Sequence, residues 1–377
     1  MTPIHRTINS DAEAPIKGRG AACRIPHRFE AWAREAFDDG WGDGAAAQDA
    51  APAPRTQWVW EEARSALTRN DSPDIFFDQA VNPYRGCEHG CIYCYARVTH
   101  SYLNLSPGLD FETRLIAKRN VAALLRAELA RPAYRPSVIN IGSATDAYQP
   151  IERQLGLTRA LIEVLAQARH PFAIITKGSG VERDIDLLAP LAQARLVAVN
   201  LTITTLDARL ARVLEPRAAA PHRRLLTIRR LAQAGIAVGV SVAPQIPFIT
   251  EDMEQVLAAA REAGASSAFY SVVRLPWELN GLMRQWLQQH YPERAARVLA
   301  RIQDLHGVDA DQRKAGRVYD SNRATRMKGQ GLWADLLRQR FEHACRQLGL
   351  ARERPPLDAT QFRPPAPSGQ QGQGVLF

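Results

Sequence analysis

The sequence predicts an α/β fold in which about six βα units follow one another along the chain. The chain has 377 residues, of which 46% are apolar, enough for one large domain with extensions or for two ordinary domains. Between residues 137 and 275, short apolar runs of strand length alternate with amphipathic stretches of helical length. This alternation is typical of parallel strands joined by crossover helices, and about six units are fewer than the eight of a closed barrel.

The first 70 residues predict a mostly irregular N-terminal leader. Residues 1–55 have few periodic hydrophobic positions and include a stretch rich in Gly, Ala and Pro, a composition that does not build a core. Within the leader we expect a short helix at residues 30–37. We also expect a strand at residues 56–60, where the side chains alternate.

Residues 71–276 predict the core barrel. Strands are expected at residues 137–141, 172–176, 196–203, 236–242 and 267–275, with one more close to the cysteine-rich stretch described below. Helices are expected at residues 111–130, 158–168, 181–192, 207–214, 221–234 and 251–263. In a parallel barrel the functional groups lie at the C-terminal ends of the strands, so the residues that follow each strand are the candidates for a site.

The remaining residues predict a helical extension, 277–350, and a disordered tail, 351–377. One long helix is expected at residues 278–305, broken near Pro292, and another at residues 332–348. The basic, glycine-containing segment 313–331 is either a solvated surface loop or a segment that contacts phosphates or closes over a site. The tail is rich in Pro, Gly and Gln, which predicts disorder.

The formal net charge is +9, from 48 Lys and Arg against 39 Asp and Glu, and Arg predominates among the basic residues. The excess fits either a solvated surface or attraction to phosphates, with which Arg pairs bidentately. Apolar runs stay well short of the ~18 residues of a membrane span, and the start of the chain lacks the apolar region of a secretory signal. With so few cysteines, we expect a protein of the reducing cytoplasm that is not attached to a membrane.

Three of the five cysteines, Cys87, Cys91 and Cys94, form a C-x3-C-x2-C motif. Three thiolates so close in sequence can converge on one metal centre if the backbone coils around it. Gly86 and Gly90 permit that coil, because glycine adopts the φ > 0 conformations of tight loops. A [4Fe-4S] cluster normally takes four cysteines, so a motif of three leaves one iron open.

Two other metal sites fit part of this pattern. A structural zinc site could add His89 to the three cysteines, although His89 lies between two of them and zinc motifs more often use C-x2-C pairs. A ferredoxin-like electron carrier would recruit a fourth cysteine, either Cys23 or Cys345.

The motif, with Tyr93 in its aromatic position, resembles the signature of radical S-adenosylmethionine (radical SAM) enzymes. The resemblance implies a [4Fe-4S] cluster whose open iron binds S-adenosylmethionine and whose electron generates a 5′-deoxyadenosyl radical that abstracts hydrogen from a substrate. It also implies a partial (β/α)6 barrel with the cluster at its open top, and an electron donor of the flavodoxin or ferredoxin type.

A second resemblance lies at the ends of the expected strands. Residues 143–152, S-A-T-D-x-Y-Q-P-x-E, and residues 214–217, L-E-P-R, are similar to the spore photoproduct lyase-like branch of the superfamily, and within it to an uncharacterised bacterial family. The resemblance implies that Thr145 and Asp146 bind the SAM amino group and that Tyr93 contacts its adenine. Lys177 and Asn200 are candidates for its carboxylate or ribose, although Lys177 could equally form an ion pair at a helix N-terminus.

Two functions remain open at this stage. The first is a radical SAM enzyme with a nucleic-acid or other phosphate-bearing substrate, and the second is a non-catalytic nucleic-acid-binding protein stabilised by zinc or an Fe-S cluster. The hydrogen donor to the substrate is also open. Cys23 and Cys345 are the remaining thiols, and the tyrosine candidates are Tyr95, Tyr148 and Tyr270.

The last five residues, from Gln373 to Phe377, suggest a partner. They follow a Pro/Gly/Gln-rich tether, and an apolar end on a polar tail gains little unless it docks. Leu376 and Phe377 could fold back onto the chain itself. Alternatively, Gln-x-x-Leu-Phe resembles the peptides with which bacterial DNA-maintenance proteins bind the replication sliding clamp.

Overall fold

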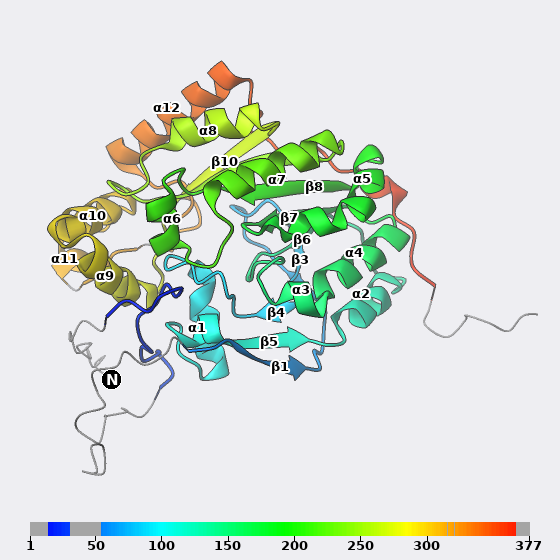
Figure 1. Cartoon of the computed structure of the whole chain (residues 1–377), viewed down its shortest axis with the longest axis horizontal. Coiled ribbons are helices and arrows are strands. Elements are labelled where there is room, and N and C mark those ends of the chain that lie inside the picture. The colour runs from blue at the N-terminus through cyan, green and yellow to red at the C-terminus, as the bar shows by residue number, and fades with distance from the viewer. Residues whose placement is uncertain (1–13, 31–53, 315, 320, 367–377) are drawn as a thin grey trace, which may run out of the picture.

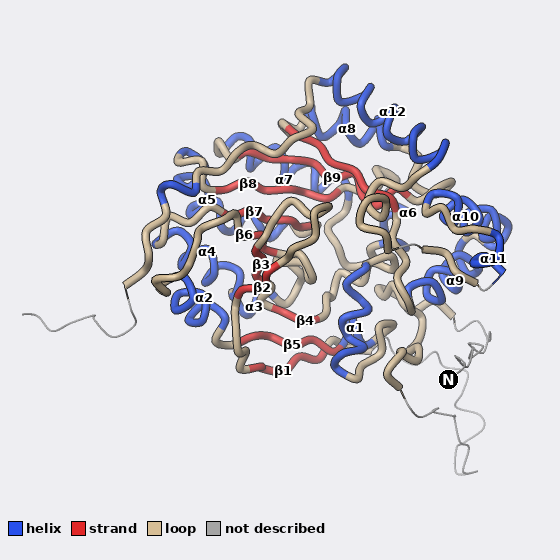
Figure 2. The backbone as a smooth tube through the Cα atoms, turned by 180° about the vertical axis from the view of Figure 1, so that it is seen from behind, coloured by secondary structure: helices blue, strands red, loops and turns tan. Residues whose placement is uncertain are grey.

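The computed structural model describes residues 14–30, 54–314, 316–319 and 321–366. Its centre is a seven-stranded sheet in the order β10-β9-β8-β7-β6-β3-β2 (Figures 1 and 2). Six of these strands are parallel, and β2 pairs with β3 in the antiparallel sense. The expected partial (β/α)6 barrel is therefore confirmed. The strands are β2 (Leu67–Arg69), β3 (Gln79–Val81), β6 (Ile139–Ile141), β7 (Phe172–Thr176), β8 (Val197–Thr202), β9 (Ala237–Gln245) and β10 (Ser267–Val272).

Alternation along each strand separates an outer from an inner face of the barrel. In β8, the side chains of Val197, Val199 and Leu201 belong to the main hydrophobic core, where the sheet meets the outer helices. Successive side chains of a strand point to opposite faces, so Asn200 and Thr202 face the inside of the barrel. The inner face therefore carries polar side chains on β8, which suits a barrel that holds a ligand at its mouth.

Helices cover the outer face of the sheet, as the crossovers of a parallel sheet require (Figure 1). Apart from α2 (Val121–Leu129) and α3 (Glu152–Leu155), their positions agree with the periodicity of the sequence to within a few residues. Asp207 caps one of them by accepting the backbone N–H groups of Arg209 and Leu210. The helices of this part are α2 (Val121–Leu129), α3 (Glu152–Leu155), α4 (Leu157–Gln167), η3 (Ser179–Asp184), α5 (Ile185–Gln193), α6 (Ala208–Leu214), α7 (Pro221–Gln233) and α8 (Met253–Glu262).

A second, three-stranded sheet in the order β1-β5-β4 lies beside the barrel (Figure 2). It consists of β1 (Gln57–Glu61), β4 (Tyr84–Arg85) and β5 (Arg114–Lys118). The single helix expected at residues 111–130 is therefore wrong: α1 (Asp110–Thr113) and α2 flank β5. Within β5, Leu115 and Ala117 are buried and the alternate residues Arg114, Ile116 and Lys118 are more exposed, so a two-residue period was hidden inside an apolar stretch.

The described part of the leader packs against the core. Glu112 accepts hydrogen bonds from the backbone N–H groups of Gly20 and Ala21, both 2.9 Å long. Ala21 and Ile25 join a hydrophobic cluster with residues from the cysteine-rich stretch and from the C-terminal extension. The helix expected at residues 30–37 lies outside the described residues apart from its first position.

The C-terminal extension is helical, with the expected break at Pro292. Its helices are α9 (Leu279–His290), α10 (Pro292–Leu305), α11 (Ala310–Lys314) and α12 (Gly331–Leu348). The basic segment between α11 and α12 follows the free edge of β10, where the N–H of Val272 donates to the carbonyl of Met327 over 2.9 Å. Arg326 then pairs with Asp74 in the loop between β2 and β3, with one N–O distance of 2.7 Å. This segment thus links the two open edges of the partial barrel.

Residues 351–366 correct the expectation of a disordered tail. The N–H of Asp358 donates to the carbonyl of Arg195 and that of Arg363 to the carbonyl of Ala168, so the segment crosses the loops that precede β8 and β7. The Phe362 ring packs on Tyr134 and His170, and the short helix η4 (Ala359–Gln361) lies between these contacts. These hydrogen bonds and the apolar contacts of Phe362 together hold a segment whose composition suggested disorder. Among the described residues, every helix is too short or too polar to cross a membrane.

Candidate active site

The cysteine loop, residues 86–94, lies between β4 and the 3₁₀ helix η2 (Tyr95–Leu103). Gly86 and Gly90 have φ of 80° and 66°, as the sequence predicted. A Cβ at Gly90 would lie 2.6 Å from a carboxylate oxygen of Glu112, so the position also lacks space for a side chain. Cys87 and Cys91 are buried, and Cys94 is partly buried.

A buried ion pair between Arg97 and Glu112 holds the backbone of this loop in place. The side chains of Arg97 and Glu112 are fully buried and in contact. Nε of Arg97 donates to the carbonyl of Cys91 over 2.8 Å, and a terminal nitrogen donates to the carbonyl of Gly90 over 2.9 Å. One guanidinium therefore satisfies loop carbonyls that would otherwise be buried without partners.

The Gln of the S-A-T-D-x-Y-Q-P-x-E motif holds the loop from the barrel side. Gln149 is fully buried. Its Oε1 accepts the N–H of Glu88 over 2.8 Å, and its Nε2 donates to the carbonyl of Gly86 over 3.3 Å. The side-chain amide of Gln149 thus accepts one backbone N–H of the loop and donates to one backbone carbonyl, as a peptide group of a neighbouring strand does.

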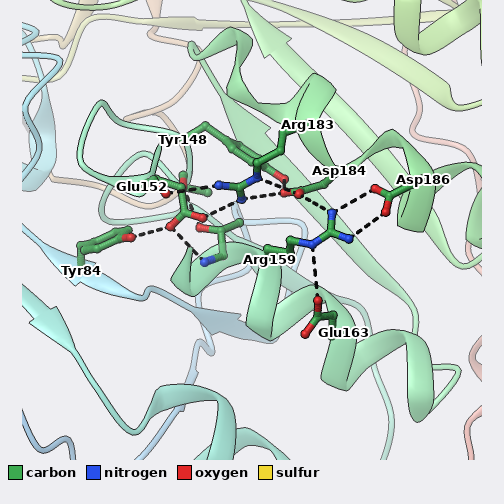
Figure 3. Close-up of polar contacts among 10 residues, drawn as sticks. Tyr84, Tyr148, Glu152, Arg159, Glu163, Arg183, Asp184 and Asp186 are labelled. Atoms are coloured by element: carbon green, nitrogen blue, oxygen red, sulfur yellow. Dashed lines mark hydrogen bonds and ion pairs between the residues drawn. The ribbon is translucent and has the colours of Figure 1, made fainter. Parts of the chain in front are cut away.

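The Glu of the same motif anchors a polar network outside the loop (Figure 3). Glu152 accepts from the hydroxyl of Tyr84 and, over 2.8 Å, from Arg183. Arg183 also pairs with Asp184, which accepts the hydroxyl of Tyr148 over 2.9 Å. Because Tyr84 belongs to β4, this network ties the strand before the cysteine loop to the motif.

The L-E-P-R segment supports the loop from a third side. The N–H of Ile92 donates to the carbonyl of Leu214, and the N–H of Arg217 donates to the carbonyl of His89. The side chain of Arg217 pairs with Glu88 at 3.0 Å. The sequence alone indicated no role for this motif, and its contacts show that it holds the cysteine loop in place.

Glu215, within that segment, is the centre of a buried polar cluster that sequence reasoning missed. It pairs with Arg224 and accepts from the hydroxyls of Tyr93 and Thr204. Burial raises the pKa of Tyr93, and the neighbouring Glu215 carboxylate raises it further. Burial alone would raise the pKa of Glu215, but the charges of Arg224 and Lys177 outweigh it and the pKa is lowered. The cluster therefore holds an ionised carboxylate against a neutral phenol.

Tyr93, the residue expected to contact adenine, points its hydroxyl into this cluster. That hydroxyl lies 3.1 Å from Oγ1 of Thr204, and the Tyr93 side chain is buried. Nζ of Lys177 lies 5.7 Å from the centre of the Tyr93 ring. An adenine contact would therefore use the ring or the backbone of Tyr93, since its hydroxyl is already engaged.

The carboxylate of Asp146 is also engaged, which speaks against its expected contact with the SAM amino group. It accepts from the Thr176 hydroxyl over 2.6 Å and from the Lys177 N–H over 2.7 Å. The N–H of Tyr148 donates to it over 2.9 Å, and Nδ1 of His89 lies 3.2 Å away. Burial would raise the pKa of this carboxyl, but His89 and the other donors hold it below its usual range. Asp146 therefore joins the ends of β6 and β7 to the cysteine loop.

Thr145 remains available for the expected contact with the SAM amino group. Its side chain is buried, and among the described residues its hydroxyl has no hydrogen-bond partner. The loop that carries it is fixed by Asn82, whose Oδ1 accepts the N–H of Ala144 over 2.8 Å. A buried hydroxyl without a partner costs free energy unless a ligand meets it.

Lys177 and Asn200 lie at different depths of the barrel. The Lys177 ammonium interacts electrostatically with Cys91 and Glu215, so it lies against the cysteine loop. Asn200 lies in the middle of β8 and packs against Gly239, where a Cβ would collide with its side chain. The structure thus brings Lys177 to the loop and leaves Asn200 deeper inside the barrel.

The three cysteines suit a cluster better than a single ion. Burial raises the pKa of the Cys87 thiol, and the nearby Asp146, Cys91 and Cys94 raise it further. Within the described residues, no three His, Cys, Asp or Glu side chains converge as a single metal ion needs. His89 faces Asp146 instead. The zinc alternative therefore loses the fourth ligand that His89 would have supplied, and the three cysteines remain as the candidate ligands of an Fe-S cluster.

A cleft of about 540 Å³ opens beside the cysteine loop. Tyr95, next to Cys94, lines it, and the guanidinium of Arg274 lies 4.2 Å from the centre of its ring. The described lining residues include three arginines and neither Asp nor Glu. They are Tyr95, Val98, Arg274, Leu275, Pro276, Trp277, Asn280, Arg317, Val318, Tyr319, Ser321 and Arg326.

Among the candidate hydrogen donors, Tyr95 is the one that lines the cleft. Tyr95 lines it with its hydroxyl donating to the carbonyl of Ser143. The hydroxyl of Tyr148 binds Asp184 and the ring of Tyr270 packs on Phe341, and neither residue lines the cleft. Cys345 is buried in α12. Cys23 contacts Gln285 rather than the cleft wall.

Comparisons with known proteins agree with this geometry. A family model described as the radical SAM superfamily matches residues 81–260. The uncharacterized protein Rv2578c of Mycobacterium tuberculosis (strain ATCC 25618 / H37Rv) is 38% identical over 238 residues, which cover 62% of this chain and 70% of that protein. The uncharacterized protein MJ0683 of Methanocaldococcus jannaschii is 28% identical over 213 residues, which cover 56% of this chain and 76% of that protein.

Solved structures of spore photoproduct lyase share the fold. One of them, a mutant with bound AdoMet and dinucleoside spore photoproduct, matches with a TM-score of 0.52 and 17% identity, over 78% of this chain and 81% of that chain. The chain belongs to the radical SAM superfamily, whose members use a [4Fe-4S] cluster and S-adenosylmethionine. It is therefore a radical SAM enzyme, and the expected cofactors are confirmed at the level of the family.

Proposed function

We propose that this radical SAM enzyme acts on a nucleic acid bound in the cleft beside the cysteine loop. One observation carries the proposal. The described residues that line the cleft include Arg274, Arg317 and Arg326 but neither Asp nor Glu, Arg326 being paired with Asp74, and Tyr95 connects the cleft to Cys94. Arginine forks pair with phosphate oxygens, and a basic groove with aromatic walls suits a polynucleotide. The formal charge of +9 acts in the same direction at longer range.

The residues of the cysteine loop would hold the cofactors. Cys87, Cys91 and Cys94 are the proposed cluster ligands, and the hydroxyl of Thr145 is the proposed contact of the SAM amino group. When bound, the cluster and SAM supply a 5′-deoxyadenosyl radical for hydrogen abstraction. The chain's own contribution is to fix the loop through Arg97 and Gln149, to keep water from the buried thiols, and to place the substrate beside Tyr95.

Two partners complete the proposal. An electron donor of the flavodoxin or ferredoxin type would reduce the cluster in a reducing cytoplasm. The last five residues, from Gln373 to Phe377, lie outside the described residues. As a sliding-clamp peptide they would bring the enzyme to replicating DNA and raise its local concentration there.

Salt-dependent binding of an oligonucleotide tests the substrate class. Fluorescence anisotropy with the full chain should give an affinity that falls steeply with salt. Arg274→Ala should weaken binding and lower the salt slope by about 0.7, the contribution of one phosphate of a single strand. Arg338→Ala is the matched control, because Arg338 is exposed on α12 and paired with Asp335. A flat dependence of affinity on salt, or equal binding by the Arg274 variant, would count against a nucleic-acid substrate.

A further inference from the structure

Three exposed aromatic rings gather beside the cleft and form what we call the aromatic platform: Phe29, Tyr102 and Trp277. They are 53%, 66% and 62% exposed. They come from three distant parts of the chain, namely the leader, the end of η2 and the loop before α9. Large apolar side chains scattered singly over a surface are ordinary, but three in one patch indicate a binding surface.

Arg28 holds the platform together. Its guanidinium lies 4.6, 4.9 and 4.3 Å from the ring centres of Phe29, Tyr102 and Trp277. Glu278 fixes the guanidinium with two contacts of 3.0 and 2.9 Å and also accepts the backbone N–H of Arg28 over 2.9 Å. The rings are thus fixed in place without being buried, and a platform that is already ordered loses little entropy on binding.

The backbone supports the same conclusion. Trp277 has φ of 46°, in the left-handed region that bulky residues rarely occupy. Strain of this kind persists where the surrounding structure holds it, and it concentrates at binding sites. At Trp277 the strained backbone carries an indole ring that is largely exposed to solvent.

The platform is continuous with the cleft. Trp277 belongs to both, and η2 carries Tyr95 of the cleft as well as Tyr102 of the platform. A ligand that reaches the cysteine loop along the arginine-lined cleft therefore passes over rings that have a free face. Flat aromatic groups joined by anionic linkers match this sequence of surfaces.

We propose that the aromatic platform stacks unpaired bases, so that the enzyme takes its substrate from a single-stranded or locally opened polynucleotide. The inference rests on the proposed nucleic-acid substrate and narrows it. In a duplex the base faces are stacked on one another, and a side-chain ring reaches them only where the strand is open. Stacking on aromatic side chains tolerates any base, so the platform supplies affinity with little sequence preference.

Binding of matched single-stranded and duplex oligonucleotides tests the inference. With a strand of about 15 nucleotides, the full chain should bind the single strand more tightly than its duplex. Trp277→Ala and Tyr102→Ala should each weaken single-strand binding by about 5- to 100-fold and change duplex binding little. Trp277→Phe, which keeps a ring, should lose less. Because both side chains are exposed, circular dichroism should show that the variants fold.

A matched control is available on the other sheet. Trp60 is 39% exposed and has its own arginine, Arg119, 5.2 Å from its ring, so Trp60→Ala removes a similar pair away from the cleft. It should leave both affinities unchanged. Equal losses for single strand and duplex, or no loss in the platform variants, would overturn the inference.

The outcomes separate the two proposals. If binding depends on salt and on Arg274 while the platform variants bind normally, the stacking inference fails and the nucleic-acid substrate stands. If neither oligonucleotide binds, or an acidic peptide of equal charge binds as tightly, both fail.

Discussion

Replacing the buried Gln149 by Leu should destabilise the cysteine loop, and with it the protein, more than replacing an exposed Gln by Leu. Gln149→Leu leaves the buried N–H of Glu88 and the carbonyl of Gly86 without partners. Each buried group left unsatisfied costs about 1–3 kcal/mol. Since the contact to Gly86 is the longer at 3.3 Å, we expect a total loss of about 2–5 kcal/mol in the free energy of unfolding.

Urea denaturation followed by circular dichroism measures this loss, and iron and sulfide content after anaerobic reconstitution measures its effect on the loop. Gln154→Leu is the control, because Gln154 is exposed, and it should change stability by about 0.5 kcal/mol or less. Equal urea midpoints and equal iron content for Gln149→Leu and the wild type would refute the role assigned to this residue.

Three further predictions concern the same supports. Gly90→Ala should destabilise the protein and lower its iron content, because a Cβ would lie 2.6 Å from Glu112. Gly156→Ala has a similar φ of 65° with open space around the Cβ and should cost only about 1 kcal/mol, as thermal unfolding of both variants would show. Arg224→Met should cost about 3–5 kcal/mol in urea denaturation, because it leaves Glu215 buried without its cation, and a smaller loss than that of Gln154→Leu would argue against the pair. Arg326 lowers the pKa of Asp74 to about 2, so this ion pair contributes stability above the ordinary pKa of Asp, and that stability is lost as the pH falls from about 4 to 2. Asp74→Asn should therefore lower stability at neutral pH and flatten the acid limb of a stability-against-pH curve, and an unchanged limb would contradict the assignment.

Local patterns were enough to predict much of the barrel. Residues 172–176 form β7 as expected, because a short continuous apolar run between polar neighbours is typical of a buried strand in an α/β fold. The φ > 0 conformations at Gly86 and Gly90 were also predictable, since a tight loop with three thiols needs them. The helix expected at residues 111–130 was wrong because β5 is short and its partner, β1, lies more than 50 residues earlier.

The supports of the site needed the structure. Gln149, Arg97 and Glu215 could be read as ordinary polar residues, because their partners come from segments that only tertiary folding brings together. The resemblance to the family assigned Asp146 to the SAM amino group. Its carboxylate turned out to be saturated by groups from the next strand and the cysteine loop. A resemblance locates such a motif but does not say which of its members touch the ligand.

The sequence also did not predict that residues 351–366 are ordered. Composition suggested disorder, and one ring, Phe362, docks the segment on Tyr134 and His170. Contacts made by a few residues, here Phe362 and the backbone N–H groups of Asp358 and Arg363, leave little trace in a composition average.

Anaerobic reconstitution followed by reduction with dithionite in the presence of S-adenosylmethionine tests the central claim most directly. The wild-type chain should bind iron and sulfide and release 5′-deoxyadenosine. The variant with Cys87, Cys91 and Cys94 all replaced by Ala should do neither, although it should fold. A wild-type protein that binds zinc tightly and releases no 5′-deoxyadenosine, or a triple variant that still releases it, would contradict the account.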